Sequence, residues 1–341
     1  MKKLFPLLAC AALVAHLPLS AQETKPAPAP GEIVAAAKAS EWVAIAPSDL
    51  LLMDLALDAK GKPRRVVIQL MPAPFSQGWI SNIRKLAAAK WWDGTSINRV
   101  QDNYVVQWGD ATEKKTLPKG LVVVQQSEYW SRFGKGMDFQ NLLPKFFAAF
   151  PDYAEKFSEV RGVDTKEFQT KLKEGLESNP DPYANTNRHV DGWPVSINYE
   201  DAIFWPVHCY GMVGVGRNLS PDTGTGAELY TVIGHAPRHL DRNIALVGRV
   251  IEGMEHLSSL PRGTGALGFY EKEEERVPIL SMRLGNEAKD VAAFEYLSTE
   301  SESFAAYADA RANRRDPFFI RPAGGADICN IPVPVRRKVG N

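Results

Sequence analysis

Three side chains that could hold a peptide lie close together in the segment Ile97–Asp110: Arg99, Tyr104 and Gln107. We interpret the segment as a strand, in which side chains alternate between two faces. Arg99 and Gln107, eight positions apart, then share a face if no bulge intervenes. Tyr104 has the opposite parity, so a turn or bulge near Gln101–Asn103 must redirect it if all three line one cleft. An arginine, an aromatic ring and an amide around an apolar groove could bind a peptide without a nucleophile or a metal.

This segment resembles the cyclophilins, the cyclophilin-type peptidyl-prolyl isomerases. In that family an Arg, a Phe five residues later and a Gln three residues further on precede Gly and Asp. Here Arg99, Tyr104 and Gln107 precede Gly109 and Asp110. Further stretches resemble other motifs of the family, in the family's order, and together they cover about half of the mature chain: Val66–Pro74 with Asn82, Gly211–Arg217, Ala227–Ile233, His239–Asp241 and Val247–Met254.

The resemblance implies a fold and a set of site residues. The fold would be mainly β: a closed, eight-stranded antiparallel barrel that is filled by side chains and capped by helices. The substrate groove would lie on the outside of the barrel. The catalytic residues would be Arg99 and Gln107. The substrate-binding residues would be Tyr104, Val105, Gly216, Arg217, Glu228, Tyr230, His239 and Leu240.

The implied reaction is cis–trans isomerisation of X–Pro bonds, and the residue types suit it. An amide twists through a resonance barrier of about 18–20 kcal/mol, and uncatalysed X–Pro exchange takes roughly tens to hundreds of seconds. No bond is made or broken, so no cofactor, base or metal is expected. A cation that donates to the prolyl nitrogen stabilises the twisted transition state rather than the ground state. Arg99 suits this role because a guanidinium stays charged and is rigidly forked.

Four positions depart from the family pattern. Glu228 stands where the family has Gln, His239 where it has Trp, Ile244 where it has His, and Val105 where it has a pocket Met. We therefore expect the catalytic arginine to be kept in a reshaped groove. A second hypothesis follows from these departures: a cyclophilin-like module that binds a particular partner and has little or no isomerase activity.

Composition limits the classes of partner. Lys+Arg and Asp+Glu are equal at 40 each, so the net charge is zero. This balance argues against a broad surface for nucleic acid or anionic membrane. The hydrophobic fraction of 45% supports a normal packed core. The resemblance implies that the partners are proline-containing segments of unfolded or exported proteins, with no nucleic acid and no membrane insertion of the mature chain.

Residues 1–21 have the pattern of a signal peptide. Lys2 and Lys3 form a positive region, Leu4–Leu19 is largely apolar, and cleavage is expected after Ala21. A lipoprotein signal that ends at Cys10 is the alternative. The apolar run is shorter than the ~20 residues of a spanning helix. We therefore expect a periplasmic or secreted protein that assists the folding of exported proteins.

The remaining chain divides into a linker, a domain and a tail. Residues 22–40 are rich in Pro and Ala and should form an extended spacer. The cyclophilin-like domain should span 41–285, and residues 286–341 should be an extension with a helix at 303–314. Short apolar or β-branched runs predict strands, and apolar side chains at helical spacing predict a helix: strands at 42–45, 50–57, 66–70, 212–216, 228–233, 244–250 and 279–284, and the helix at 77–90.

Residues 111–207 exceed the corresponding connection of the family several-fold. We interpret them as a helical insertion in the β domain. Apolar side chains on one helical face predict a helix at 142–150, and a second helix is predicted at 165–176. A strand is expected at 121–125 and a loop at 179–193, which is rich in Asn, Asp and Pro.

Two cysteines, Cys209 and Cys329, remain once the signal peptide is removed. In an oxidising compartment they could pair and tie the C-terminal tail to the main domain. Alternatively, each could be a buried thiol that packs as a small hydrophobic residue. The sequence leaves both interpretations open.

Two other motifs suggest different chemistry. Asp222–Thr225 matches the active-site tetrapeptide of aspartic proteases, but Pro221 precedes it where those enzymes have an apolar strand. The chain has no second Asp-Thr-Gly, so a protease would have to be a homodimer, and we interpret the motif as a loop beside the pocket. His235 and His239 lie four residues apart, but Pro237 between them breaks any helix. No metal site is therefore expected.

Overall fold

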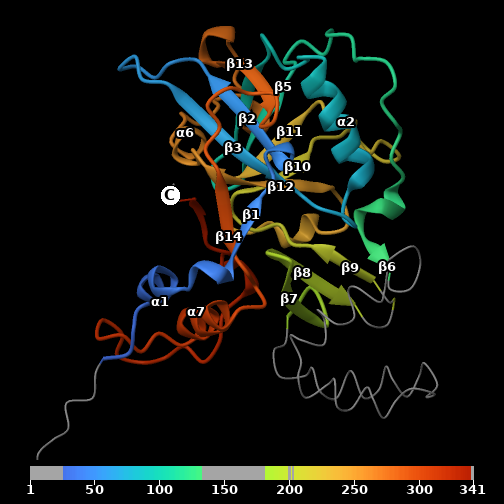
Figure 1. The fold of residues 1–341 in the computed structure, drawn as a ribbon. Helices are drawn as coiled ribbons and strands as arrows, with labels where there is room; N and C mark the ends of the chain where they lie inside the picture. The colour runs from blue at the N-terminus through green and yellow to red at the C-terminus, as the bar shows by residue number, and fades with distance from the viewer. Residues whose placement is uncertain (1–25, 133–180, 199–200, 202, 339–341) are drawn as a thin grey trace, which may run out of the picture.

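Eight strands of the computed structural model close into an antiparallel barrel, which confirms the expected fold class (Figure 1). The structure describes residues 26–132, 181–198, 201 and 203–338. Each of the eight strands is hydrogen-bonded to two antiparallel neighbours. Around the barrel the strands follow in the order β10 (Met212–Val215), β11 (Leu229–Val232), β5 (Val105–Gly109), β4 (Ser96–Val100), β13 (Val277–Leu284), β2 (Leu50–Leu55), β3 (Arg64–Leu70) and β12 (Leu246–Glu252).

Alternating side chains of the strands fill the barrel. In the register of β2 and β3, Leu51 lies opposite Ile68 and Met53 lies opposite Val66. All four side chains have an exposed fraction of 0%. Because residues two apart in a strand share a face, these pairs point into the barrel together. Each such side chain contributes about 1.5–3 kcal/mol by burial, so the barrel is a rigid support for whatever lies on its outer wall.

Helix α2 (Gln77–Ala88) packs its apolar face on the barrel core. Ile83 and Leu86 are completely buried, as their helical spacing in the sequence predicted, and Trp79 is buried as well. The helix ends two residues earlier than expected because Lys90, just beyond its C-cap, has a positive φ of 54°. A left-handed residue after the last turn is a common helix terminator. The short helix α6 (Glu255–Ser258) follows β12.

The described part of the insertion forms a second sheet. Its order is β6 (Ser131–Arg132), β9 (Ile203–Pro206), β8 (Trp193–Asn198) and β7 (Thr186–Val190). The prediction of a loop at 179–193 was therefore wrong over most of its second half, and residues 121–125 are not a strand. The helices predicted at 142–150 and 165–176 lie outside the described residues.

The loop prediction failed because a tight turn was taken for a longer irregular segment. Asp191 and Gly192 join β7 to β8, and both have positive φ, 49° and 84°. This is the backbone of a two-residue hairpin turn. One face of the sheet then packs on the barrel: Trp193 and Ile197 share a buried cluster with Met212 of β10. Both faces of β8 are buried over residues 193–197, and a strand buried in this way lacks the simple alternation that signals a strand.

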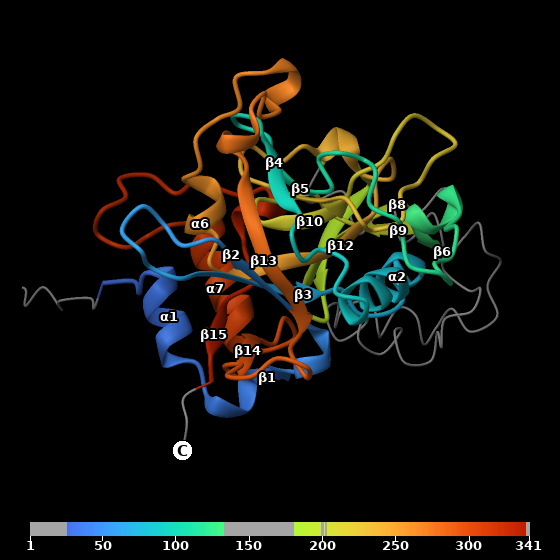
Figure 2. The same ribbon diagram turned by 90° about the horizontal axis from the view of Figure 1, so that it is seen from above.

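The two ends of the described chain form a third unit beside the barrel (Figures 1 and 2). Strand β1 (Trp42–Ile45) pairs with β14 (Phe294–Leu297), which pairs with β15 (Val335–Arg337). Helix α1 (Pro30–Ala36) contacts α7 (Glu302–Ala312). The C-terminal extension is thus partly helical, as predicted, but it also contributes two strands.

The prediction that residues 22–40 form only an extended spacer was wrong from Pro30 onward. Pro30 occupies the first turn of α1, where its fixed φ favours a helix and its missing N–H is not needed. The Glu32 carboxylate accepts a hydrogen bond of 2.7 Å from the backbone N–H of Ala29. Ile33 and Val34 then pack against a cluster that includes Phe304 of α7. The predicted signal peptide lies outside the described residues.

A disulfide joins Cys209, just before β10, to Cys329 in the extension, across 120 residues of sequence. Of the two interpretations that the sequence left open, the structure has the bonded one. The bond attaches the C-terminal extension to the barrel. None of the helices among the described residues is long and apolar enough to cross a membrane.

Candidate active site

The β4–β5 hairpin places Arg99 opposite Gln107 on the outside of the barrel. Arg99 Nη1 donates to Gln107 Oε1 at 3.1 Å. The predicted single strand is therefore two strands, with the turn at the expected position, where Asn103 has a positive φ of 50°. The register also shifts between Ile97 and Arg99. Arg99 and Gln107 thus meet because their strands pair, not because of parity along one strand.

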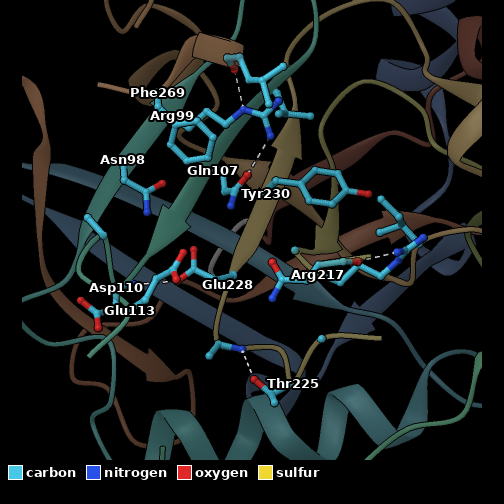
Figure 3. Close-up of a pocket in the computed structure, with 18 of the residues that line it drawn as sticks. Asn98, Arg99, Gln107, Asp110, Glu113, Arg217, Thr225, Glu228, Tyr230 and Phe269 are labelled. Carbon is cyan, nitrogen blue, oxygen red and sulfur yellow. Dashed lines mark hydrogen bonds between the residues drawn. The ribbon is translucent and has the colours of Figure 1, made fainter. Parts of the chain in front are cut away.

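Arg99 is held in one orientation by hydrogen bonds and rings (Figure 3). Its Nε donates to the carbonyl of Leu267 at 2.7 Å, and its Nη2 donates to the Gln101 side chain. Its Cζ lies 5.2 Å from the centroid of the Phe269 ring and 5.7 Å from that of Tyr104. Burial lowers the pKa of Arg99, but a guanidinium remains charged near neutral pH. A partly desolvated, pre-oriented cation interacts strongly with a nearby lone pair.

Beside Arg99 an apolar slot opens into a groove of about 690 Å³. Val105 and Tyr230 are almost fully buried, at 3% and 4% exposure, and form one cluster with Val232. The slot is the part of the groove that is lined by five side chains: Tyr104, Val105, Tyr230, Leu240 and Ile244. The sequence predicted the first four as substrate contacts, and the structure brings them together.

Glu228 lies on the opposite side of Gln107 from Arg99 (Figure 3). Its Oε1 accepts the backbone N–H of Asp110 at 2.7 Å, and the side chains of Gln107 and Asn98 also hydrogen-bond to it. A Cβ atom on Gly109 would lie 1.8 Å from Glu228 Oε1, so only glycine leaves room for this carboxyl. Burial raises the pKa of Glu228 to about 7, against the opposing effect of these hydrogen bonds.

This shift predicts how stability depends on pH. Because the folded pKa of Glu228, about 7, exceeds its ordinary value of 4.5, the stability that its protonated form contributes is present below pH 4.5 and is lost as pH rises to about 7. Glu228→Gln should therefore increase the free energy of unfolding by on the order of 3 kcal/mol at pH 8, and hardly at all at pH 4.5. Urea unfolding of both proteins at the two pH values measures this. An equal difference at both values would contradict it.

Of the other predicted substrate contacts, some line the groove and one does not. Arg217 lines the groove, where its Nε and Nη2 donate to the carbonyl of Asn243 at 3.1 and 3.0 Å. Gly216 also lines the groove, and a Cβ there would lie 3.0 Å from Glu228 Cβ. His239 is exposed and does not line the groove. The expectation that His239 is a substrate-binding residue was therefore wrong, because the turn at 238–240 presents Leu240 to the groove instead.

Two residues that hold Arg99 in place were not predicted from the sequence. Leu267 and Phe269 belong to a loop before β13, and they supply a carbonyl acceptor and a ring to Arg99. The backbone of Phe269 also forms an isolated bridge with that of Arg99. The glycines around this loop, at 263, 265 and 268, signal a turn, but nothing in the sequence indicates which distant strand the turn approaches.

The motifs for other chemistry have structural roles. The Asp222 carboxylate accepts the backbone N–H groups of Asn218 at 2.8 Å and Gly224 at 3.0 Å, so it stabilises its own loop. That loop borders the groove, as the sequence predicted. Among the described residues no group of three or more His, Cys, Asp or Glu side chains could hold a metal ion.

Comparisons with known proteins agree with this geometry. The model of the family described as cyclophilin type peptidyl-prolyl cis-trans isomerase/CLD matches residues 64–284. The structure is similar to the crystal structure of the cyclophilin AquaCyp293 from Hirschia baltica, with a TM-score of 0.56 and 18% sequence identity, over 88% of this chain and 94% of that chain. No curated protein sequence matches this chain.

A second crystal structure, of a cyclophilin-type peptidyl-prolyl cis-trans isomerase from Cryptosporidium parvum in the presence of the dipeptide Ala-Pro, is less similar. The TM-score is 0.34 and the identity 9%, over 68% of this chain and 98% of that chain. The family model alone spans more than half of the 341 residues. The chain therefore belongs to the cyclophilin-type peptidyl-prolyl cis-trans isomerases.

Proposed function

We propose that this protein accelerates cis–trans isomerisation of X–Pro bonds in exported proteins, with Arg99 as the catalytic residue. The observation that carries the proposal is the position of Arg99: an oriented, partly buried cation beside an apolar slot. A proline ring is apolar and has no N–H, so a slot lined by aliphatic and aromatic side chains suits it.

The mechanism follows from the donors of Arg99. A guanidinium has five N–H groups, and three of them donate to Leu267, Gln107 and Gln101. Among the described residues, this leaves one N–H on each terminal nitrogen for a substrate. As the X–Pro amide twists, its nitrogen loses resonance and gains a lone pair. Donation to that lone pair lowers the barrier, because the interaction is absent in the planar ground state.

Gln107 has two roles in this proposal. Its Oε1 fixes the guanidinium, and its amide group lies between Arg99 and Glu228, where it can also contact the backbone of a bound peptide (Figure 3). The apolar slot would hold the proline ring, and the wider groove would hold the flanking residues. No cofactor takes part in this mechanism.

The role in export is supported by the N-terminal sequence pattern and by the disulfide, since such bonds persist in oxidising compartments. Two experiments test it. N-terminal sequencing of the purified mature protein from cell fractions should give Gln22 as the first residue in a periplasmic or secreted fraction. Second, the protein should shorten the slow refolding phase of an exported protein that contains a native cis-proline. A cytoplasmic, uncleaved chain would contradict the proposed localisation.

The second candidate is a binding module with little or no turnover. It is favoured by Glu228, which puts a carboxyl where the family has an amide, and by the additional sheet and extension. Partner affinity and the exchange rate of generic X–Pro peptides distinguish the two functions. A binding module would bind one partner tightly and would leave these peptides at their spontaneous exchange rate.

A further inference from the structure

The wall of the apolar slot contains a tyrosine whose hydroxyl is buried. Tyr230 is 4% exposed, and its hydroxyl points away from Arg99 (Figure 3). The hydroxyl lies 2.9 Å from His208 Nε2. A buried hydroxyl without a partner costs about 1–3 kcal/mol. The contact with His208 therefore allows a tyrosine to present only its ring to the slot.

His208 is itself fixed in the core. Its exposed fraction is 1%, and its Nδ1 lies 2.8 Å from Asp241 Oδ1, which also accepts the backbone N–H of His208 at 3.0 Å. The imidazole ring is nearly parallel to that of Tyr230, at an interplanar angle of 10°. In a neutral imidazole the proton sits on the nitrogen that faces the carboxylate, so Nε2 accepts the hydroxyl proton.

Behind His208, Asp241 and Arg238 of the barrel domain connect to the parts of the chain that are added to the barrel. Arg238 Nε donates to Asp241 Oδ2 at 2.9 Å, and its Nη1 donates to Asp181 at 3.0 Å. Arg238 Nη2 also donates to Ser196 of β8 at 3.0 Å. The same nitrogen, Arg238 Nη1, also lies 3.5 Å from Asp327 Oδ2 of the extension. The Arg238 and Asp181 side chains are only 3% and 5% exposed, so this is a buried charge network with multiple partners.

The disulfide reaches the same place. Cys209 directly follows His208, and Cys329 lies two residues after Asp327. The inserted sheet and the C-terminal extension therefore meet at the back of the slot, one through Asp181 and Ser196, the other through Asp327 and the disulfide. The barrel motifs alone would leave the Tyr230 hydroxyl without this support.

We propose that His208 is a positioning residue for the isomerase site: it holds the Tyr230 hydroxyl so that the tyrosine ring forms the back wall of the proline slot, and the inserted sheet and C-terminal extension brace His208 through Asp241 and Arg238. This inference rests on the proposed function, and it gives the two added parts of the chain a role in that function. Without His208, the Tyr230 side chain would rotate toward the open slot, where its hydroxyl can reach water, and would obstruct the proline ring.

The test is a double-mutant cycle between His208→Met and Tyr230→Phe. His208→Met fills similar space without a ring nitrogen, and Asp241 keeps the backbone N–H of His208 and the Arg238 side chain as partners. We expect His208→Met to weaken X–Pro peptide binding and to lower kcat/KM by about tenfold when Tyr230 is present. In the Tyr230→Phe background, where no hydroxyl needs a partner, the same substitution should change both by less than twofold.

The matched control is His189→Met. His189 is a half-buried histidine, bonded to the carbonyl of Ile331 at 2.9 Å and packed on Phe304, and it is not among the residues that line the groove. Its replacement should leave peptide affinity and kcat/KM unchanged even if it lowers stability. An equal loss from His208→Met in both backgrounds would mean that His208 supports only the fold, and would overturn the inference.

A second readout does not depend on turnover. A crystal structure of the His208→Met protein should show the Tyr230 ring rotated into the slot, and that of the double variant should show the phenylalanine ring at the original position. A Tyr230 ring that stays in place would overturn the inference while leaving the proposed function intact. Conversely, an inactive wild type with a rotated ring in His208→Met would refute the isomerase proposal but not the positioning of Tyr230.

Discussion

Arg99→Ala should lower kcat/KM for X–Pro isomerisation by about 100- to 1000-fold, the usual effect of removing one donor to a transition state. The expectation rests on the orientation of Arg99 by Leu267 and Gln107, next to the apolar slot. Stability should hardly change, because the side chain is only partly buried. The measurement is the relaxation rate of a short X–Pro peptide at low temperature, at several enzyme concentrations.

Two further variants make this result specific. Arg99→Lys keeps the charge but loses the planar fork, so its kcat/KM should lie between that of Arg99→Ala and that of wild type. Arg65→Ala removes an arginine of β3 that pairs with Asp54 at 2.7 Å, outside the groove, and should leave the rate unchanged. If Arg99→Ala retained the wild-type rate, the assignment of catalysis to this residue would be wrong.

Removing the Cys209–Cys329 disulfide should be the largest single change in stability. The bond closes a loop across 120 residues, and a cross-link of that span is worth about 5 kcal/mol by restricting the unfolded chain. The double variant Cys209→Ser, Cys329→Ser should therefore have a free energy of unfolding lower than that of wild type by that amount. Urea denaturation measures this difference, and the midpoint of the variant should lie at a lower urea concentration. Wild type treated with a reductant should behave alike. Coincident unfolding curves for oxidised and reduced protein would contradict this expectation.

Single elements of the barrel and the centre of the site could be predicted because they are local in sequence, whereas the closed barrel itself was expected only from the family resemblance, since its closure pairs distant strands such as β2 and β13. The β-branched run at 66–70 indicates a buried strand, and the helical spacing over 77–90 indicates which face of the helix is buried. The hairpin around Gln101–Asn103 brings Arg99 and Gln107 together within a short stretch, so their order and spacing were enough to suggest the site. The structure adds that the two residues meet because β4 pairs with β5, not because they lie on one face of a single strand.

The remaining parts depend on contacts between distant segments. Phe269 reaches Arg99 from a loop 170 residues away in sequence, and no periodicity signals that approach. His208, in the connection between β9 and β10, bonds to Tyr230 of β11. Helix α1 is short and gains its stability from α7, at the far end of the chain, and a helix of that length is marginal when isolated. The composition of residues 22–40 therefore predicted a spacer.

The central claim is tested most directly by exchange NMR on a proline-containing peptide with wild-type protein at a tenth of the peptide concentration. We expect the cis and trans signals to exchange much faster than the spontaneous tens of seconds, and the added rate to disappear with Arg99→Ala. Saturable binding of the peptide with exchange at the spontaneous rate would contradict the proposed isomerase function and would make this chain a binding module built on a cyclophilin barrel.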